Sequence, residues 1–212
     1  MPPPTSRRLA LAVLAAAAGL VPLAAFSGPA KESWDSVVKP EAKVEVMPRR
    51  ARLEVDGKER GRGFATLDVT DPRRKFRVRA TAEGFEPAEA VVEGGAIADQ
   101  SFFLALRPLG FGSTRRLDPR DAPSMAQAAA ALWRAGRVDD AAEYAEQSLR
   151  GGETALANRV LGDVWRRRGD RDRAVRHYAS YLSLAQDPPE AAEIRAWVSQ
   201  GKGDITIPQE RR

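Results

Sequence analysis

Cysteine is absent from this sequence and histidine occurs once, at position 177, which removes most of the side chains that bind transition metals. Without thiols the chain forms no disulfide framework, carries no lipid on a cysteine, and builds no zinc or iron–sulfur site on thiolates. A single imidazole also argues against a histidine-rich metal site. Carboxylate sites for calcium stay open as an alternative, but no aspartate loop with the spacing of a calcium site is present. We therefore expect no metal and no cofactor.

Sequence signatures of catalysis are also absent. The chain has no Gly-x-Ser-x-Gly elbow, no phosphate-cradling loop and no dinucleotide fingerprint, and "GKERGRG" lacks the strand-to-helix context that such a loop needs. His177 stands beside Tyr178 and is expected to be a surface or groove residue. The carboxylates of "RVDDAAEYAEQ" suit a solvated helix face, although a glycosidase-type pair stays open. The sequence favours a protein that is not an enzyme.

Net charge is modest. A formal charge of +5 over 212 residues is too small to indicate nucleic acid as a partner. With 43% hydrophobic and 30% charged residues, the chain has enough apolar content for one large or two small globular units.

The first thirty residues have the layout of an export signal. A basic pair, Arg7 and Arg8, precedes an apolar run, Pro22 and a cluster of small residues. An uncleaved signal anchor is the alternative, because the apolar stretch 9–26 approaches the length that spans a membrane. Pro22 favours cleavage, since it interrupts a spanning helix. Both interpretations place the rest of the chain in the periplasm or cell envelope, the second as a single-pass inner-membrane protein.

Between residues 43 and 107, apolar residues alternate with charged ones, which predicts short half-buried strands. The expected inward residues are Val44, Val46, Leu53, Val55, Leu67, Val69, Phe76, Val78 and Ala80. Turn signals such as "MPRR", "VDGKERGRG", "TDPRRK" and "EGFEP" separate them at intervals of about ten residues, the rhythm of a small antiparallel sandwich or barrel.

The segments "VEVMPRRARLEVDGKERGRG", "FRVRATAEGFEPAEAVVEGG" and "SFFLALRP" resemble a PEGA domain, a small β-domain of exported bacterial proteins. The resemblance rests on a proline, turn glycines and a closing apolar strand: Pro48, Asp56, Gly57, Gly61 or Gly63, Gly84 and Phe85. It implies a compact β-domain over residues 43–108. "FATLD" and "TDPRRK" depart from the family pattern, and an unrelated seven-stranded sandwich is the alternative.

From Pro123 onward alanine-rich helical patterns take over, with Asp121 as an expected helix cap. "GRVDDAAEYAEQSL" at 136–149 returns as "GDRDRAVRHYASYL" at 169–182. The copies resemble tetratricopeptide repeats, which are stacked helix pairs. The second copy matches at Leu161, Gly162, Trp165, Gly169, Ala174, Tyr178 and Tyr181. The first matches at Gly136, Ala141, Ser148 and Leu149, with the smaller Ala128, Ala129 and Leu132 upstream.

A last segment, "PPEAAEIRAWVSQG", predicts a terminal helix that covers the second copy. Two repeats are fewer than the usual minimum of about three, so the β-domain, an upstream helix or another chain must cover the remaining apolar side. The expected fold class is α+β multidomain, a small antiparallel β-sandwich followed by an α-helical hairpin-repeat array. The expected segments are a signal at 1–30, linkers at 31–42 and 109–121, the β-domain at 43–108, helices at 122–200 and a tail at 201–212.

The repeat resemblance implies protein partners held in a groove of inner helices. The candidate protein-binding residues there are Trp133, Arg159, Asp163 and Arg166. The two-carboxylate clamp of some family members is not matched, because its lysine and asparagine positions are absent. We therefore expect a non-enzymatic binding or scaffold protein of the bacterial cell envelope, whose partner the sequence does not identify.

An arginine-rich stretch in the β-domain gives a second hypothesis. Between Pro48 and Arg79 there are eleven basic residues against five acidic ones. Arginine forks bind phosphate and carboxylate, so this face is a candidate for peptidoglycan, lipopolysaccharide or anionic lipid, and a solvated surface is the simpler interpretation. The candidate contacts are Arg49, Arg50, Arg52, Arg77 and Arg79. A third hypothesis is an accessory subunit of an envelope enzyme.

Overall fold

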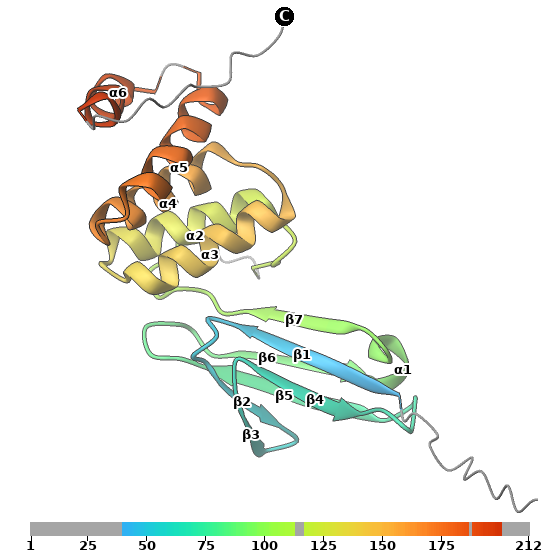
Figure 1. Cartoon of the computed structure of the whole chain (residues 1–212). Helices are drawn as coiled ribbons and strands as arrows, with labels where there is room; N and C mark the ends of the chain where they lie inside the picture. Colours follow the sequence, from blue (N-terminus) through green and yellow to red (C-terminus); the bar gives the residue numbers. More distant parts are fainter. Residues whose placement is uncertain (1–39, 113–116, 187, 201–212) are drawn as a thin grey trace, which may run out of the picture. The chain divides into compact units, whose positions relative to one another are not determined.

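The computed structural model describes residues 40–112, 117–186 and 188–200 (Figure 1). The expected signal segment lies outside the described residues. Among those residues no helix is long and apolar enough to cross a membrane. Strands come first along the chain and helices follow, so the structure is a mixed α+β fold.

Seven strands form two small sheets in the described part of the chain. The three-stranded sheet has the order β4-β1-β7, with β1 Glu41–Met47, β4 Phe64–Asp68 and β7 Ser101–Ala105. The four-stranded sheet has the order β3-β2-β5-β6, with β2 Arg52–Val55, β3 Lys58–Arg62, β5 Lys75–Thr81 and β6 Ala88–Glu93. Every residue expected to point inward is buried, and these side chains share one core cluster. The predicted sandwich-like arrangement is confirmed at this level.

Three features differ from the sequence prediction. The sandwich is not wholly antiparallel, because β1 pairs with β7 in parallel. The stretch "VDGKERGRG" is more than a turn, since its second half forms the exposed strand β3. This strand contains no apolar residue, so the alternation of apolar and polar residues could not predict it. The stretch "EGGAIADQ" contains a short helix, α1 Gly94–Ile97. Asp56 and Gly57 do form the turn between β2 and β3, as expected.

Two helix pairs of equal dimensions follow the strands. The first pair is α2 Ala122–Arg134 and α3 Val138–Gly151, and the second is α4 Ala155–Arg167 and α5 Arg171–Leu184. All four bounds of the second pair lie 33 residues after their counterparts in the first. A shorter helix, α6 Ala191–Ser199, ends the described chain. The internal sequence repeat therefore corresponds to a repeat of secondary structure.

The turn inside each pair is built in the same way. Gly136 and Gly169 adopt φ of 75° and 76°, a left-handed conformation that glycine adopts without strain. Each turn satisfies two carbonyls at the end of the preceding helix with two backbone N–H groups. The bonds are Gly136 N to Trp133 O, Arg137 N to Leu132 O, Gly169 N to Arg166 O and Asp170 N to Trp165 O. The two glycines of the sequence repeat thus end equivalent helices.

Close packing inside the second pair depends on Gly162. A Cβ atom placed there would lie 2.4 Å from both Cδ1 and Cε1 of Tyr178, so the glycine lets the ring lie directly on α4. The Tyr178 ring is fully buried and meets Trp197 of α6 edge-on, with ring centroids 5.4 Å apart. α6 therefore covers the second pair. The sequence "PPEAAEIRAWVSQG" predicted such a terminal helix.

The first pair packs against the strands through Tyr144 of α3. Its buried hydroxyl donates to the carbonyl oxygens of Leu106 (2.6 Å) and Met47 (3.2 Å), and its ring stacks on Phe85 at 5.9 Å. One core cluster runs from the sheets into α2, α3 and α4. The strands thus cover the apolar side that the two helix pairs leave open. This is one of the three covers expected from the sequence, beside an upstream helix and another chain.

Candidate functional site: an inner-helix groove

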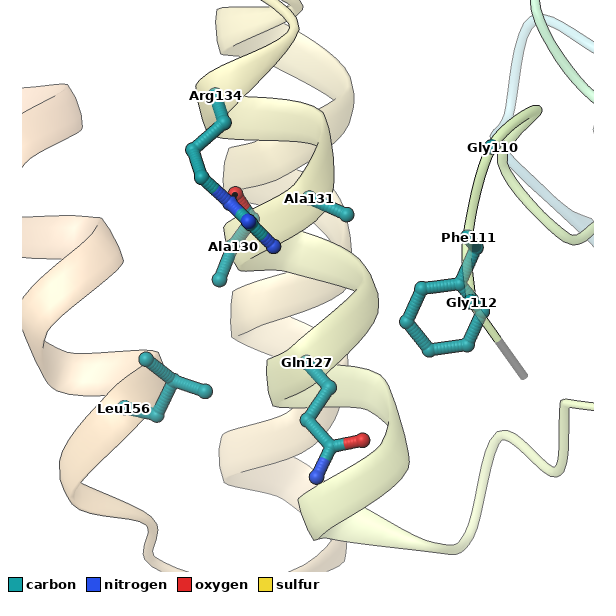
Figure 2. A pocket seen from close by; sticks show the side chains of 8 residues that line it. All are labelled: Gly110, Phe111, Gly112, Gln127, Ala130, Ala131, Arg134 and Leu156. Carbon is teal, nitrogen blue, oxygen red and sulfur yellow. Dashed lines mark hydrogen bonds between the residues drawn. The ribbon is translucent and has the colours of Figure 1, made fainter.

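Helices α2 and α4 line a depression of about 590 Å³. Figure 2 shows its side chains along α2, with Leu156 on α4 to one side and the loop of Phe111 to the other. The lining residues are Gly110, Phe111, Gly112, Gln127, Ala130, Ala131, Arg134 and Leu156. Small alanines make the floor, and Leu156 is partly exposed at 38%. The depression therefore offers apolar surface next to one cation.

A second, shallower depression of about 400 Å³ is lined by Trp133, Asp163, Arg166 and Arg167. The two depressions share no lining residue, but both are lined by the C-terminal turn of α2, through Trp133 and Arg134, and by residues of α4. We call them together the inner-helix groove. Three of the four residues that the sequence nominated for protein binding, Trp133, Asp163 and Arg166, thus line one place.

Two cations of the groove have no carboxylate partner among the described residues. Arg134 donates from Nε to the carbonyl oxygen of Ala130 at 3.3 Å, and Arg167 lies over the Trp133 ring at 5.9 Å. Arg166 pairs weakly with exposed Glu193 at 3.7 Å. An arginine that has no ion pair and lies over an aromatic ring is well placed to bind a carboxylate of another molecule.

Arg159, the fourth nominated residue, is occupied within the chain. Its guanidinium pairs with Asp163 of the same helix and with Glu190 at 3.2 Å, and lies 5.7 Å from the Tyr178 ring. The side chain therefore links α4 to the start of α6. Arg159 and Asp163 are both half-buried and hydrogen-bond to each other. Their role is therefore to hold α4 rigid beside the groove.

Sequence reasoning missed Arg134 and Arg167 as groove residues. A signal for them was present: they lie 33 residues apart and occupy the last position of α2 and of α4. Phe111 and Leu156 had no such signal, because their proximity to α2 depends on how the chain folds back.

The outer face of the four-stranded sheet carries Arg77 and Arg79 side by side, both exposed as expected. The depression there, about 640 Å³, is lined by three cations and three carboxylates: Lys75, Arg77, Arg79, Glu54, Asp56 and Glu89. Arg77 pairs with Glu89 at 3.4 Å. The Arg77 backbone N–H bonds to Asp56 and lowers the pKa of that carboxyl. Local charge is balanced, which disfavours an anion-selective surface.

The other three arginines of that hypothesis lie in different surroundings. Arg52 pairs with Glu59 and, at 3.8 Å, with Glu54. Arg50 lies in the turn before β2 and pairs with Asp140 of α3 at 3.0 Å. The Arg49 backbone N–H donates to Glu143 of the same helix. The five arginines therefore do not form one patch.

His177 has a structural role in the second pair. Its Nδ1 lies 3.0 Å from Oδ1 of buried Asn158, and burial lowers the pKa of the imidazole. In the described part of the chain no group of three or more histidine, cysteine, aspartate or glutamate side chains could hold a metal ion. Every buried side-chain nitrogen or oxygen there has a hydrogen-bond partner.

The chain matches no protein-family model, and no curated protein matches it either. The resemblances to PEGA and tetratricopeptide sequences therefore rest on the residues quoted for them.

Proposed function

We propose that this protein is a non-enzymatic binding protein of the bacterial cell envelope that holds a protein partner in its inner-helix groove. The observation that carries the proposal is the combination of Arg134 and Arg167, both without ion pairs in the described structure, with Trp133 and with the apolar lining of the first depression. Arginine and tryptophan dominate the energetics of protein interfaces. The groove thus has the residue types of a binding site.

The organisation of the helices supports a protein as the partner. Stacked helix pairs present an extended surface made by successive inner helices, and such surfaces suit protein segments. α2 and α4 are the equivalent helices of the two pairs, and both contribute to the groove. The tetratricopeptide resemblance points the same way.

Export is the part of the proposal that rests on sequence. The basic pair, apolar run and small residues at 1–30 have the order of a secretory signal, and the absence of cysteine excludes a lipidated cysteine after it. A role as accessory subunit of an envelope enzyme is compatible with this groove, since the enzyme would then be the partner.

Charge reversal in the groove tests the proposal. Tagged full-length protein carrying Arg134→Glu and Arg167→Glu is compared with wild type for proteins recovered after crosslinking in native cells. The expected result is loss of the partner with the helical circular dichroism unchanged, because both side chains are exposed and unpaired.

The matched control is Lys75→Glu with Arg79→Glu, which reverses the same charge on the sheet face. This variant should recover the partner as wild type does. Loss of envelope association in the control, with full partner recovery in the groove variant, would replace the groove by the arginine face as the binding site.

A further inference from the structure

A second cleft, of about 440 Å³, lies where the three-stranded sheet meets α3. It shares no lining residue with the inner-helix groove. Phe64 and Phe103 come from the sheet, Glu143, Gln147 and Arg150 come from α3, and Arg62 comes from the end of β3. We call it the junction cleft.

Two phenylalanines make the sheet side of the junction cleft. Phe64 of β4 and Phe103 of β7 are the register partners of Glu45 of β1 from opposite sides, so the three residues form one row on the outer face. Phe64 is 60% exposed. An outer sheet face is ordinarily polar, and an isolated exposed apolar residue needs no explanation. Exposed Phe64 and half-buried Phe103, beside a cleft with cations that have no ion pair in the described structure, form a specific arrangement.

Gly63 brings the basic residues to this row. A Cβ atom at Gly63 would lie 2.4 Å from the Arg49 carbonyl oxygen, so only glycine lets the start of β4 pass this close to the Pro48–Arg50 turn. The Gly63 backbone is held there by bonds to Val46 and Ala51. Arg62 directly precedes Gly63 in the chain, and the position of Gly63 therefore places Arg62 in the same cleft as Phe64.

The helix side of the cleft is ordered by hydrogen bonds. Glu143, Gln147 and Arg150 lie at helical spacing along α3 and so share one stripe. The Arg49 backbone N–H holds the Glu143 carboxylate at 2.8 and 3.1 Å. Arg150 donates from Nε to the Gln147 side-chain oxygen at 2.8 Å. The side chains are thus positioned without a ligand.

Charge in the junction cleft is unbalanced. Four cations and two carboxylates line it: Lys43, Arg49, Arg62, Arg150, Glu45 and Glu143. Glu45 is neutralised by Lys43 at 2.8 Å, and Glu143 accepts from the Arg49 backbone. Arg62, on the sheet side, and Arg150, on the helix side, have no ion pair within the described ranges. The row of Phe64, Glu45 and Phe103 therefore lines the same cleft as two guanidinium groups that have no ion pair among the described residues.

We propose that the junction cleft binds an extended acidic segment of a protein partner, which places an apolar side chain on Phe64 and Phe103 and carboxylates at Arg62 and Arg150. Arginine forks match carboxylates in geometry and charge. Aromatic anchors with flanking arginines are the residues that dominate protein interfaces. The site is separate from the inner-helix groove, so the protein has two independent binding surfaces.

The test uses three short fluorescent peptides and the full chain, with binding followed by anisotropy. In the first peptide glutamates alternate with phenylalanine and leucine. In the second serine replaces the apolar residues, and in the third lysine replaces the glutamates. We expect wild type to bind the first peptide and to bind the other two at least about tenfold more weakly.

Phe64→Ser and Arg62→Glu should each weaken binding of the first peptide about tenfold. Val91→Ser is the matched control, because Val91 is 61% exposed on the other sheet, and it should bind as wild type does. Arg134→Glu, in the inner-helix groove, should also leave this affinity unchanged. Failure here therefore does not bear on the groove proposal.

Several results would overturn the inference. Equal affinity for the first and second peptides would mean that the cleft recognises only the glutamates and not the apolar side chains. Unchanged binding by Phe64→Ser, or loss in Arg134→Glu, would place the peptide elsewhere. Binding to phosphatidylglycerol vesicles in place of the peptide would make the cleft a lipid site. Dimerisation of wild type that Phe64→Ser abolishes would make it a self-association surface.

Discussion

Tyr144 is the residue on which the junction between strands and helices depends most. It is fully buried, and its hydroxyl donates to the carbonyl oxygen of Leu106, just after β7, at 2.6 Å, with the carbonyl oxygen of Met47 at the end of β1 3.2 Å away. Burial raises the pKa of this phenol well above its ordinary value, so it stays a hydrogen-bond donor throughout the neutral range. A phenylalanine would fill the space but leave the carbonyl oxygens without this donor.

Tyr144→Phe should lower the free energy of unfolding by about 1–3 kcal/mol, the usual effect of leaving a buried polar group unsatisfied. Denaturant unfolding of the full chain measures it. Tyr181→Phe is the comparison variant, since its hydroxyl bonds to one carboxylate, that of the only partly buried Glu190. An effect of Tyr144→Phe no larger than that of the comparison variant would contradict the assigned role.

Gly162→Ala separates two opposing effects. Helix propensity favours alanine by about 1 kcal/mol. The new Cβ would lie 2.4 Å from two atoms of the Tyr178 ring, and overpacking costs about 1–3 kcal/mol. The ring has little room to move, because its hydroxyl bonds to Asp163 at 2.6 Å. We expect a net loss of up to about 2 kcal/mol, and a melting temperature above that of wild type would refute the close packing.

Gly162 and Tyr144 show what the sequence reveals at the residue scale. Gly162 follows from local pattern, because a small residue at a helical spacing from aromatics predicts where two neighbouring helices touch. Tyr144 does not, since its partners Met47 and Leu106 are 97 and 38 residues away in the chain. The sequence shows an aromatic on α3 but not which surface it meets.

At the scale of elements, the helices were predictable and one strand was not. Gly136 and Gly169 mark the ends of α2 and α4, and the 33-residue offset is visible in the sequence. β3 carries no apolar residue and is held by pairing with β2, so no periodicity marks it. The parallel pairing of β1 with β7 joins the first and last strands, and short-range patterns contain no information on it.

Two tyrosine hydroxyls of α5 bond to carboxylates: Tyr181 to Glu190 at the start of α6, and Tyr178 to Asp163 of α4. Burial, reinforced by bonds to Asp163 and Glu190, raises the pKa of Tyr178 and of Tyr181 to about 12. The folded state thus favours the neutral phenols. Their contribution to stability is complete below about pH 10, where unfolded tyrosines ionise, and is lost as pH rises through about 12.

This linkage predicts how the tyrosines titrate. The chain has three tyrosines, and Tyr144, Tyr178 and Tyr181 all have raised pKa values. Near-ultraviolet phenolate absorbance should therefore be absent at pH 10 in the folded protein and should appear at higher pH, accompanied by loss of helical circular dichroism. A phenolate step near pH 10 with the circular dichroism unchanged would contradict the described burial of at least one tyrosine.

At the scale of the whole molecule, the strands and helices are joined by a charged cluster as well as by Tyr144. Asp140 of α3 is largely buried and pairs with Arg50 at 3.0 Å and Arg137 at 2.8 Å. Arg137 also lies 4.8 Å from the Phe85 ring. In the sequence Arg50 and Arg79 belong to one basic stretch, and only the folded chain separates Arg50, which pairs with Asp140 of α3, from Arg79, which lies on the sheet face.

The central claim, that a protein partner occupies the inner-helix groove, is tested most directly by photo-crosslinking in native cells. A photoreactive amino acid replaces Arg134 in one strain and, as a control, Arg79 on the sheet face in another. We expect a discrete protein adduct from position 134, which disappears when Arg167→Glu is added, and none from position 79. An adduct from position 79 alone, or an adduct at 134 that Arg167→Glu does not reduce, would contradict it.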